Sequence, residues 1–273
     1  MKVNSSPRLS APHLSIFAAI ALMMCVQAVQ ADDVIAQAYD IKDVSELVVS
    51  GGGRVEIVQG QTETLRVEAT QEVMDRVRVD LSGGTLDLSV KHTASKGLNL
   101  FDLFKQGKGE VRYVLQLKKL NYLGLSGASR ATIGNWVGGD MKVHVSGAGA
   151  ANFSNLRGND LFIELTGASN SQVQTLVANK LTFELSGAAN MDVKSTSQAS
   201  FLKIGASGAS NFWGKLLKVT EADIQASGAS NIDLQVTESL KANASGASNI
   251  RYLGQPKIDR HTSGASHVKA MKD

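Results

Sequence analysis

The stretch Ser227-Gly228-Ala229-Ser230-Asn231-Ile232 recurs unchanged at Ser245 to Ile250, and its first three residues return throughout the second half of the chain. Eight copies of this Ser/Thr-Gly-Ala tripeptide begin at Ser126, Ser146, Thr166, Ser186, Ser207, Ser227, Ser245 and Ser263. Successive copies are 20, 20, 20, 21, 20, 18 and 18 residues apart. A near-constant period with glycine at a fixed phase is typical of a solenoid, whose repeats bury their apolar faces by stacking.

Apolar and polar residues alternate before each tripeptide. Counted back from the Ser or Thr, the first, third and fifth positions are mostly apolar, as in Leu165, Ile163 and Leu161, and the positions between them are mostly polar. This period of two indicates a strand with one buried face. A second such strand follows the tripeptide, with Ile232 and Leu234 as inward residues of one coil. The sequence therefore predicts an all-β fold, a parallel β-helix whose coils are about 4.8 Å apart.

The corners and the end of this β-helix can also be predicted. Glycine in each tripeptide supplies the positive φ that a sharp corner requires, and polar turns are expected between the walls at 155–160 and 194–200. An asparagine column is expected to bond from coil to coil and pin the register, the alternative being a ligand-binding row; it comprises Asn170, Asn190, Asn211, Asn231 and Asn249. Arg260 and Thr262 stand at inward positions of the last coil, which predicts a capping coil at the C-terminal end.

The composition excludes several classes of site. The 273 residues include 26 glycines but only three prolines and one cysteine, and downstream of residue 30 there is one proline, Pro256, and no cysteine. Disulfides, thiol nucleophiles and cysteine-ligated metals are thereby excluded from that part. The basic and acidic residues number 28 and 25. Such nearly equal numbers do not indicate a basic surface for binding nucleic acid.

The first 31 residues are predicted to be a cleaved signal peptide. Lys2 and Arg8 give a positive start, 14–29 is an apolar stretch, and Val29-Gln30-Ala31 places small residues where signal peptidase cleaves. A membrane anchor is the alternative, but the run is shorter than the ~18–20 residues needed to span a bilayer. A lipoprotein signal at Cys25 is disfavoured by the bulky Met24. We therefore expect a mature chain of residues 32–273, exported to the periplasm, the cell surface or the medium, with no transmembrane segment.

We interpret residues 32–273 as a single β-helix domain, with irregular early coils at 41–120 and regular repeats at 121–268. An insertion loop at 91–110 interrupts the early coils. It carries an apolar cluster among lysines, formed by Leu98, Leu100, Phe101, Leu103 and Phe104. This cluster is a candidate docking surface for a partner or for lipid headgroups. The alternative is that the loop folds back and caps the solenoid.

Residues with catalytic potential are few. No complete nucleotide-binding, zinc or serine-hydrolase motif is present, and we predict no cofactor. One outward column of successive coils carries His144, Glu164 and Glu184. Stacking would bring the two carboxylates to about 5 Å, near the separation used by retaining glycosidases, and the trio could hold a divalent cation. The alternative, which we favour, is a solvated face.

The recurrent S-G-A-S-N-I motif resembles the head GIN domain, a family of exported bacterial proteins named as auto-transporter adhesin heads. Ser50-Gly51-Gly52-Gly53 and Leu81 to Leu86 are similar to its early coils, so the resemblance covers about residues 41–268. It implies a single-stranded right-handed β-helix and a surface or periplasmic role, with no catalytic residues to transfer. Parallel crossovers generally share this handedness.

Three functions follow as hypotheses. The first is a non-catalytic module of the bacterial cell envelope that binds a protein or glycan in an adhesion-like manner. The second is a carbohydrate-active enzyme, a polysaccharide lyase or hydrolase, which only fold analogy supports. The third is a structural spacer.

Overall fold

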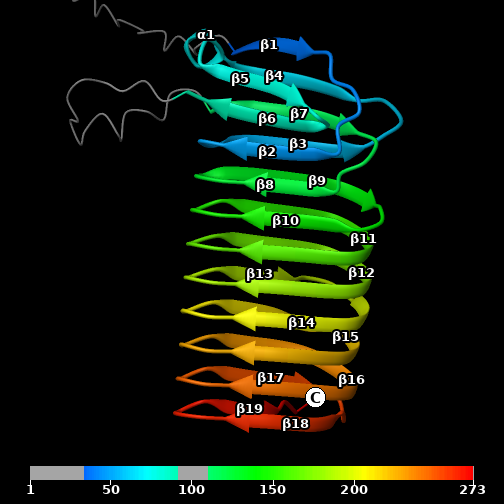
Figure 1. Cartoon of the computed structure of the whole chain (residues 1–273), viewed down its shortest axis with the longest axis vertical. Coiled ribbons are helices and arrows are strands. Elements are labelled where there is room, and N and C mark those ends of the chain that lie inside the picture. Colours follow the sequence, from blue (N-terminus) through cyan, green and yellow to red (C-terminus); the bar gives the residue numbers. More distant parts are fainter. Residues whose placement is uncertain (1–33, 92–109, 273) are drawn as a thin grey trace, which may run out of the picture. The chain divides into compact units, whose positions relative to one another are not determined.

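The repeats form the parallel β-helix that the sequence predicts (Figure 1). The computed structural model describes residues 34–91 and 110–272. The predicted signal peptide and the apolar cluster of the insertion loop lie outside these residues. In the described residues, each coil contributes one strand segment to each of two facing walls.

The first wall holds the strand segments that precede the tripeptides. Its strands are, in spatial order, β6 (Thr85–Val90), β2 (Glu46–Ser50), β8 (Tyr122–Leu125), β10 (Met141–Val145), the second halves of β11 (Ala150–Leu165), β12 (Asn170–Leu185), β14 (Ser197–Ala206), β15 (Asn211–Ala226) and β16 (Asn231–Ala244), and finally β18 (Lys257–Thr262).

The second wall holds the segments that follow the tripeptides. Its strands are β7 (Arg112–Leu117), β3 (Gly53–Gln59), β9 (Ser129–Val137), the first halves of β11 and β12, β13 (Asn190–Val193), the first halves of β15 and β16, β17 (Asn249–Leu253) and β19 (His267–Ala270). Apolar side chains of both walls fill the interior, and Trp136, Phe183 and Phe212 are among the largest that are fully buried. Alternating residues thus bury one face of each wall.

Every tripeptide forms a corner between the walls. The eight glycines from Gly127 to Gly264 have φ values between 69° and 78°, a region that only glycine occupies without steric cost. From Ala148 onward, the alanine after each glycine donates its N–H to the glycine carbonyl of the preceding coil, as Ala209 does to Gly187 at 2.7 Å. The corners therefore stack through backbone hydrogen bonds.

The serine after the tripeptide closes the corner. Ser230 is fully buried, and its Oγ donates to the carbonyl of Ser227 at 2.8 Å. The same bond joins Ser248 to Ser245 at 2.9 Å. Most buried hydroxyls have a partner, and the carbonyl three residues earlier also supplies it at Ser129, Ser210 and Ser266, whereas the buried Ser169 Oγ has none among the described residues. This geometry explains why serine returns at the fourth position of the repeat.

The opposite side of each coil differs from the prediction. The sequence predicts polar turns at 155–160 and 194–200, but β11 runs without a break through the first of these segments. Its ladder with β12 includes Asn155, Gly158 and Asp160. Only residues 194–196 lie outside a strand in the second segment. Polar side chains on a bend that faces solvent do not require the backbone to leave the ladder, and this explains the error.

The asparagine column forms the predicted ladder over four coils. Asn211 Nδ2 donates to Asn190 Oδ1 at 2.7 Å, Asn231 to Asn211 at 2.9 Å, and Asn249 to Asn231 at 3.1 Å. The backbone register continues the column to Asn170. Asn211 and Asn231 each use a donor and an acceptor along the stack, so a shift of register would break the whole set.

The first coils are stacked out of chain order. The coil formed by β2 and β3 lies between the coil of β6 and β7 and the coil of β8 and β9. The coil of β2 and β3 comes first in the sequence but is second in the stack. The coil of β6 and β7, which comes next in the sequence, is at the end of the stack. The early strands belong to the β-helix, but their position in it does not follow their position in the sequence.

Antiparallel strands close this N-terminal end. β5 (Val77–Ser82) and β6 form a hairpin rather than successive coils, since Gly83 and Gly84 both have positive φ, as a two-residue hairpin turn requires. β4 (Thr64–Thr70) pairs antiparallel with β7 and with β1 (Val34–Tyr39), and α1 (Gln71–Met74) links β4 to β5. At the other end, Arg260 Nη1 bonds the carbonyl of Val268 at 3.2 Å, across the last coil.

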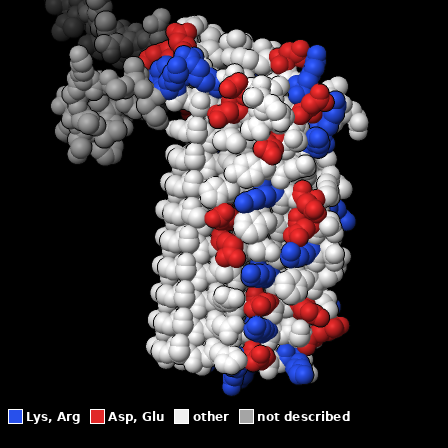
Figure 2. Space-filling model, viewed as in Figure 1, with Lys and Arg blue, Asp and Glu red and all other residues white. Residues whose placement is uncertain are grey.

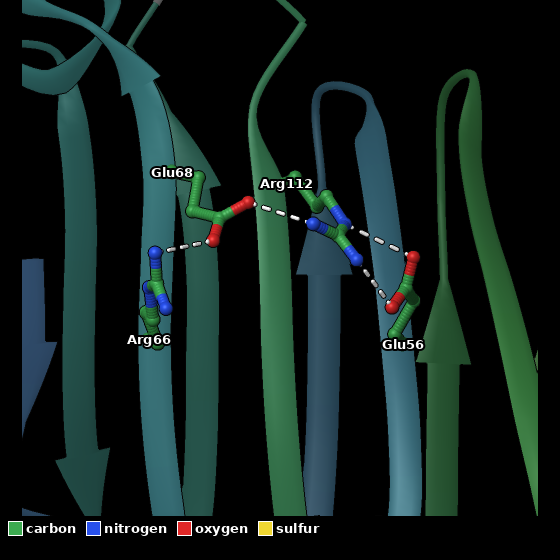
Figure 3. A network of polar contacts seen from close by, with 4 residues as sticks. All are labelled: Glu56, Arg66, Glu68 and Arg112. Carbon is green, nitrogen blue, oxygen red and sulfur yellow. Dashed lines mark hydrogen bonds and ion pairs between the residues drawn. The ribbon is translucent and has the colours of Figure 1, made fainter. Parts of the chain in front are cut away.

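An ion-pair network holds three strands of the N-terminal end together (Figure 3). Arg112 on β7 contacts Glu56 on β3 through Nε and Nη2, at 3.0 and 2.7 Å, and Glu68 on β4 through Nη1 at 2.8 Å. Arg66 contacts the other oxygen of Glu68 at 2.9 Å. The hydrogen bonds from Arg112 hold the pKa of Glu56 below its usual range. The guanidinium thus joins the displaced coil to the antiparallel strand beyond it.

We predict that Arg112→Gln raises the pKa of Glu56 toward its ordinary value, because the amide cannot replace a bidentate guanidinium. A carboxylate with a lowered folded-state pKa stabilises the fold above its unfolded pKa, near ~4.3, and loses that contribution as pH falls through the lowered value. The difference in urea midpoint between wild type and Arg112→Gln should therefore shrink on acidification. Carboxyl NMR titration measures the pKa, Arg157→Gln is the control, and an unchanged Glu56 titration would contradict the prediction.

Candidate functional site

The predicted column of His144, Glu164 and Glu184 lies on the outer face of the first wall. The three residues are in register on β10, β11 and β12. His144 Nδ1 lies 3.1 Å from Glu164 Oε2, and about a third of each side chain is exposed. The structure therefore brings the three together as the sequence analysis expects.

The next coil leaves space below Glu184. Gly205 is its register partner on β14, and a Cβ at this position would overlap the Glu184 carboxylate. The carboxylate therefore leans over a position that has no side chain. The column continues through Gln225 and Asn243 to His261, whose side chains hydrogen-bond readily.

A groove of about 820 Å³ follows this column. One side is lined by Glu164, Glu184, Gly205, Gln225, Asn243 and His261, and the other by the tripeptide hydroxyls of Thr166, Ser186, Ser207, Ser227, Ser245 and Ser263. Between the two rows lie Leu185, Ala206, Ala226, Ala244 and Thr262, of which all but Thr262 are buried. The groove spans six coils, which corresponds to about 24 Å along the axis.

The charges of the groove are unevenly placed. Its two carboxylates are at the end nearer the N-terminus of the stack, amides occupy the middle, and His261 lines the other end. The edge of stacked Ser-Gly-Ala corners that borders the groove carries no Lys, Arg, Asp or Glu (Figure 2). The groove therefore offers mainly neutral hydrogen-bonding groups beside one acidic end.

Only some of the residues that line this groove are predicted from the sequence. Glu164 and Glu184 line the groove, whereas His144 lies beside it and contacts Glu164. Within residues 34–91 and 110–272, no group of three or more His, Cys, Asp or Glu side chains is arranged to hold a metal ion. The column residues from Gly205 to His261 are not among the residues predicted from the sequence, although counting the same column down the remaining repeats would identify them.

The protein is thus a β-helix with a long polar groove beside its column of glycine corners. Residues 43–256 match the family described as "Putative auto-transporter adhesin, head GIN domain". The chain belongs to this family, as its repeated motif indicates. Comparison with curated proteins gives no match. In the described part of the chain, no helix has the length and apolar character needed to cross a membrane.

Solved structures share the fold at low sequence identity. A "putative lipid binding protein" from Parabacteroides distasonis superposes with a TM-score of 0.77 at 19% identity, covering 88% of this chain and 97% of its own. A "putative adhesin" from Parabacteroides merdae gives a TM-score of 0.75 at 17% identity, with 88% and 96% covered. One from Bacteroides fragilis gives 0.63 at 18% identity, with 88% and 97% covered. These likenesses establish the architecture.

Proposed function

We propose that the protein is a non-catalytic binding module of the bacterial cell envelope, which holds an extended glycan along the groove of the first wall. The groove is the observation that carries the proposal. It runs along the axis between a column of tripeptide hydroxyls and a column that carries polar side chains except at Gly205. A repeating surface suits a repeating ligand, because each coil can contribute an equivalent hydrogen bond.

The family supports the same function. Its description as an adhesin head, and the adhesin names of two similar structures, agree with recognition of envelope molecules. Export through the predicted signal peptide would place the module in the periplasm or at the cell surface, where such glycans occur. The proposal includes residues 32–273 acting as a single β-helix domain.

Gly205→Tyr is expected to weaken glycan binding at least about 10-fold, since a phenol at this position fills the middle of the groove. Gly205 has no positive φ, and the atom it would displace is the flexible end of Glu184, so the fold should tolerate the change. The purified protein would be tested against immobilised peptidoglycan, capsular polysaccharide and lipopolysaccharide. Lys203→Tyr, two residues earlier on the same outer face, is the matched control.

Two results would replace the proposal. If no polysaccharide is retained, or if Gly205→Tyr binds as well as Lys203→Tyr, the groove is not a binding site and the spacer function is favoured. The second candidate, an enzyme, draws support from the adjacent carboxylates Glu164 and Glu184 in the groove. Release of reducing ends that is abolished by Glu164→Gln would establish cleavage.

A further inference from the structure

An exposed tryptophan stands on the outer face of the second wall, away from the groove. Trp213 on β15 is 41% exposed, whereas Trp136 is 1% exposed. The positions in register with Trp213 are polar in every other regular coil: Thr132, Asn152, Gln172, Asp192, Asp233, Arg251 and Lys269. Trp213 thus differs from the polar residues in register with it, and its accessible ring offers an apolar face to a ligand.

An ion pair between Asp233 and Arg251 orients the side chains in the two coils that follow Trp213. The Asp233 side chain is only 4% exposed and receives two hydrogen bonds from Arg251, at 2.6 and 2.8 Å. Lys215 Nζ lies 3.8 Å from the same carboxylate. Arg251 remains half exposed and is held in one orientation by this pairing. The guanidinium is therefore pre-organised at the surface.

A hollow of about 350 Å³ begins one coil beyond Trp213. It is lined by Asn231, Asn249, Ile250, Arg251, His267 and Lys269. No carboxylate of the described residues lines it, whereas Arg251, which is paired with Asp233, and Lys269 both do. Complementary charge therefore favours an anionic group in the hollow.

The asparagine ladder borders both the tryptophan and the hollow. Asn211 is two residues before Trp213 on the same face of β15, and Asn231 and Asn249 line the hollow. The ladder ends at Asn249, and among the described residues no side chain donates to its Oδ1. An amide oxygen, a guanidinium and an ammonium thus lie within about 14 Å of the indole along the axis.

We propose that this surface, formed by Trp213, Asn231, Asn249, Arg251, His267 and Lys269, binds a carboxylated saccharide. The apolar face of one sugar ring stacks on Trp213, and the carboxylate of a neighbouring sugar accepts hydrogen bonds from Arg251 and Lys269. Sugar hydroxyls bond the amides of the ladder. This site is independent of the groove on the first wall and goes beyond the proposed function.

A lipid surface fits these observations less well. Asp192 and Asp233 stand in the coils directly before and after Trp213. Both carboxylates are paired with cations, Asp192 with Lys194 and Asp233 with Arg251, and a single indole between polar positions offers little apolar area for insertion into a bilayer. Pre-oriented amides also favour a ligand that is rich in hydroxyl groups.

The proposal is tested by titrating the full protein with tetragalacturonate and with a hyaluronan tetrasaccharide. Binding is measured by calorimetry and by the change in tryptophan emission. We expect the wild type to bind at least one of them about 10-fold more tightly than its methyl-esterified form, and more weakly as salt is raised. Trp213→Ala and Lys269→Gln should each weaken binding about 10-fold or more. Trp213→Phe should keep much of the affinity while removing the emission change, since Trp136 is buried.

A matched control separates this site from a general effect of surface charge. Lys203→Gln removes an exposed lysine from the first wall and should leave binding of the acidic oligosaccharides unchanged. If neither oligosaccharide binds, or if Trp213→Ala and Lys269→Gln bind like the wild type, the proposal is wrong. It is also overturned if both oligosaccharides fail while phosphatidylglycerol vesicles bind through Trp213.

Discussion

Replacing Gly187 with alanine is expected to lower the free energy of unfolding by about 2–5 kcal/mol. Gly187 has a φ of +78°, which costs an L-residue about 1–2 kcal/mol. Its new Cβ would lie 2.6 Å from the carbonyl oxygen of Gly167 in the preceding coil. That oxygen already accepts the N–H of Ala188 at 2.8 Å, so the backbone must shift, at a further cost of about 1–3 kcal/mol.

Urea denaturation followed by circular dichroism measures this effect, and Gly134→Ala provides the control. Gly134 lies on β9 with no positive φ, and the atom nearest to an alanine methyl group at this position would be 3.8 Å away. We expect its stability to be unchanged or increased by up to about 1 kcal/mol. Equal urea midpoints for Gly187→Ala and the wild type would show that the corners do not depend on stacked glycines.

Phe183→Ala should destabilise the protein by about 3–5 kcal/mol, the range for truncating a buried phenylalanine. Phe183 lies on β12 in the first wall and is fully buried. Its ring packs against that of Phe212 on β15, in the second wall, with centroids 4.9 Å apart and planes inclined at 51°. The truncation would therefore leave a cavity between the walls that the β-ladders prevent from closing.

Phe162→Ala is the matched control for Phe183→Ala. Phe162 lies one coil away on the first wall, is partly exposed, and has Lys142 Nζ 5.1 Å from its ring centroid. An exposed contact of this kind contributes about 0.5–1 kcal/mol. If the two alanine variants unfold at similar urea concentrations, the assignment of inward and outward positions is wrong for this wall.

Much of the regular half could be predicted because its interactions repeat at a constant distance along the chain. The tripeptide marks the phase of every coil, so the partner of Asn211 can be found by counting to Asn231. The same counting places Glu164 and Glu184 side by side. The rest of the groove follows the same rule, and it escapes notice because the column passes through Gly205, which has no side chain to suggest a site.

Other features depend on the free energy of the whole stack and leave no periodic trace. In the sequence, the segment around Gly83-Gly84 resembles another coil. It is instead a hairpin, in which β5 pairs antiparallel with β6, because the stack ends there. The strands β2 and β3 lie between later coils, where each has a parallel partner on both sides. Pairing between strands so distant in the sequence cannot be predicted from a local sequence pattern.

The amino-acid sequence by itself determined the repeat, the inward positions and the glycine corners, because steric limits on φ and the two-residue period of a strand act locally. Tertiary structure alone decided the spatial order of the first coils, the hollow beside Arg251 and the width of the groove. These depend on which side chains meet across coils and on the space that remains between them, and that is a property of packing in three dimensions.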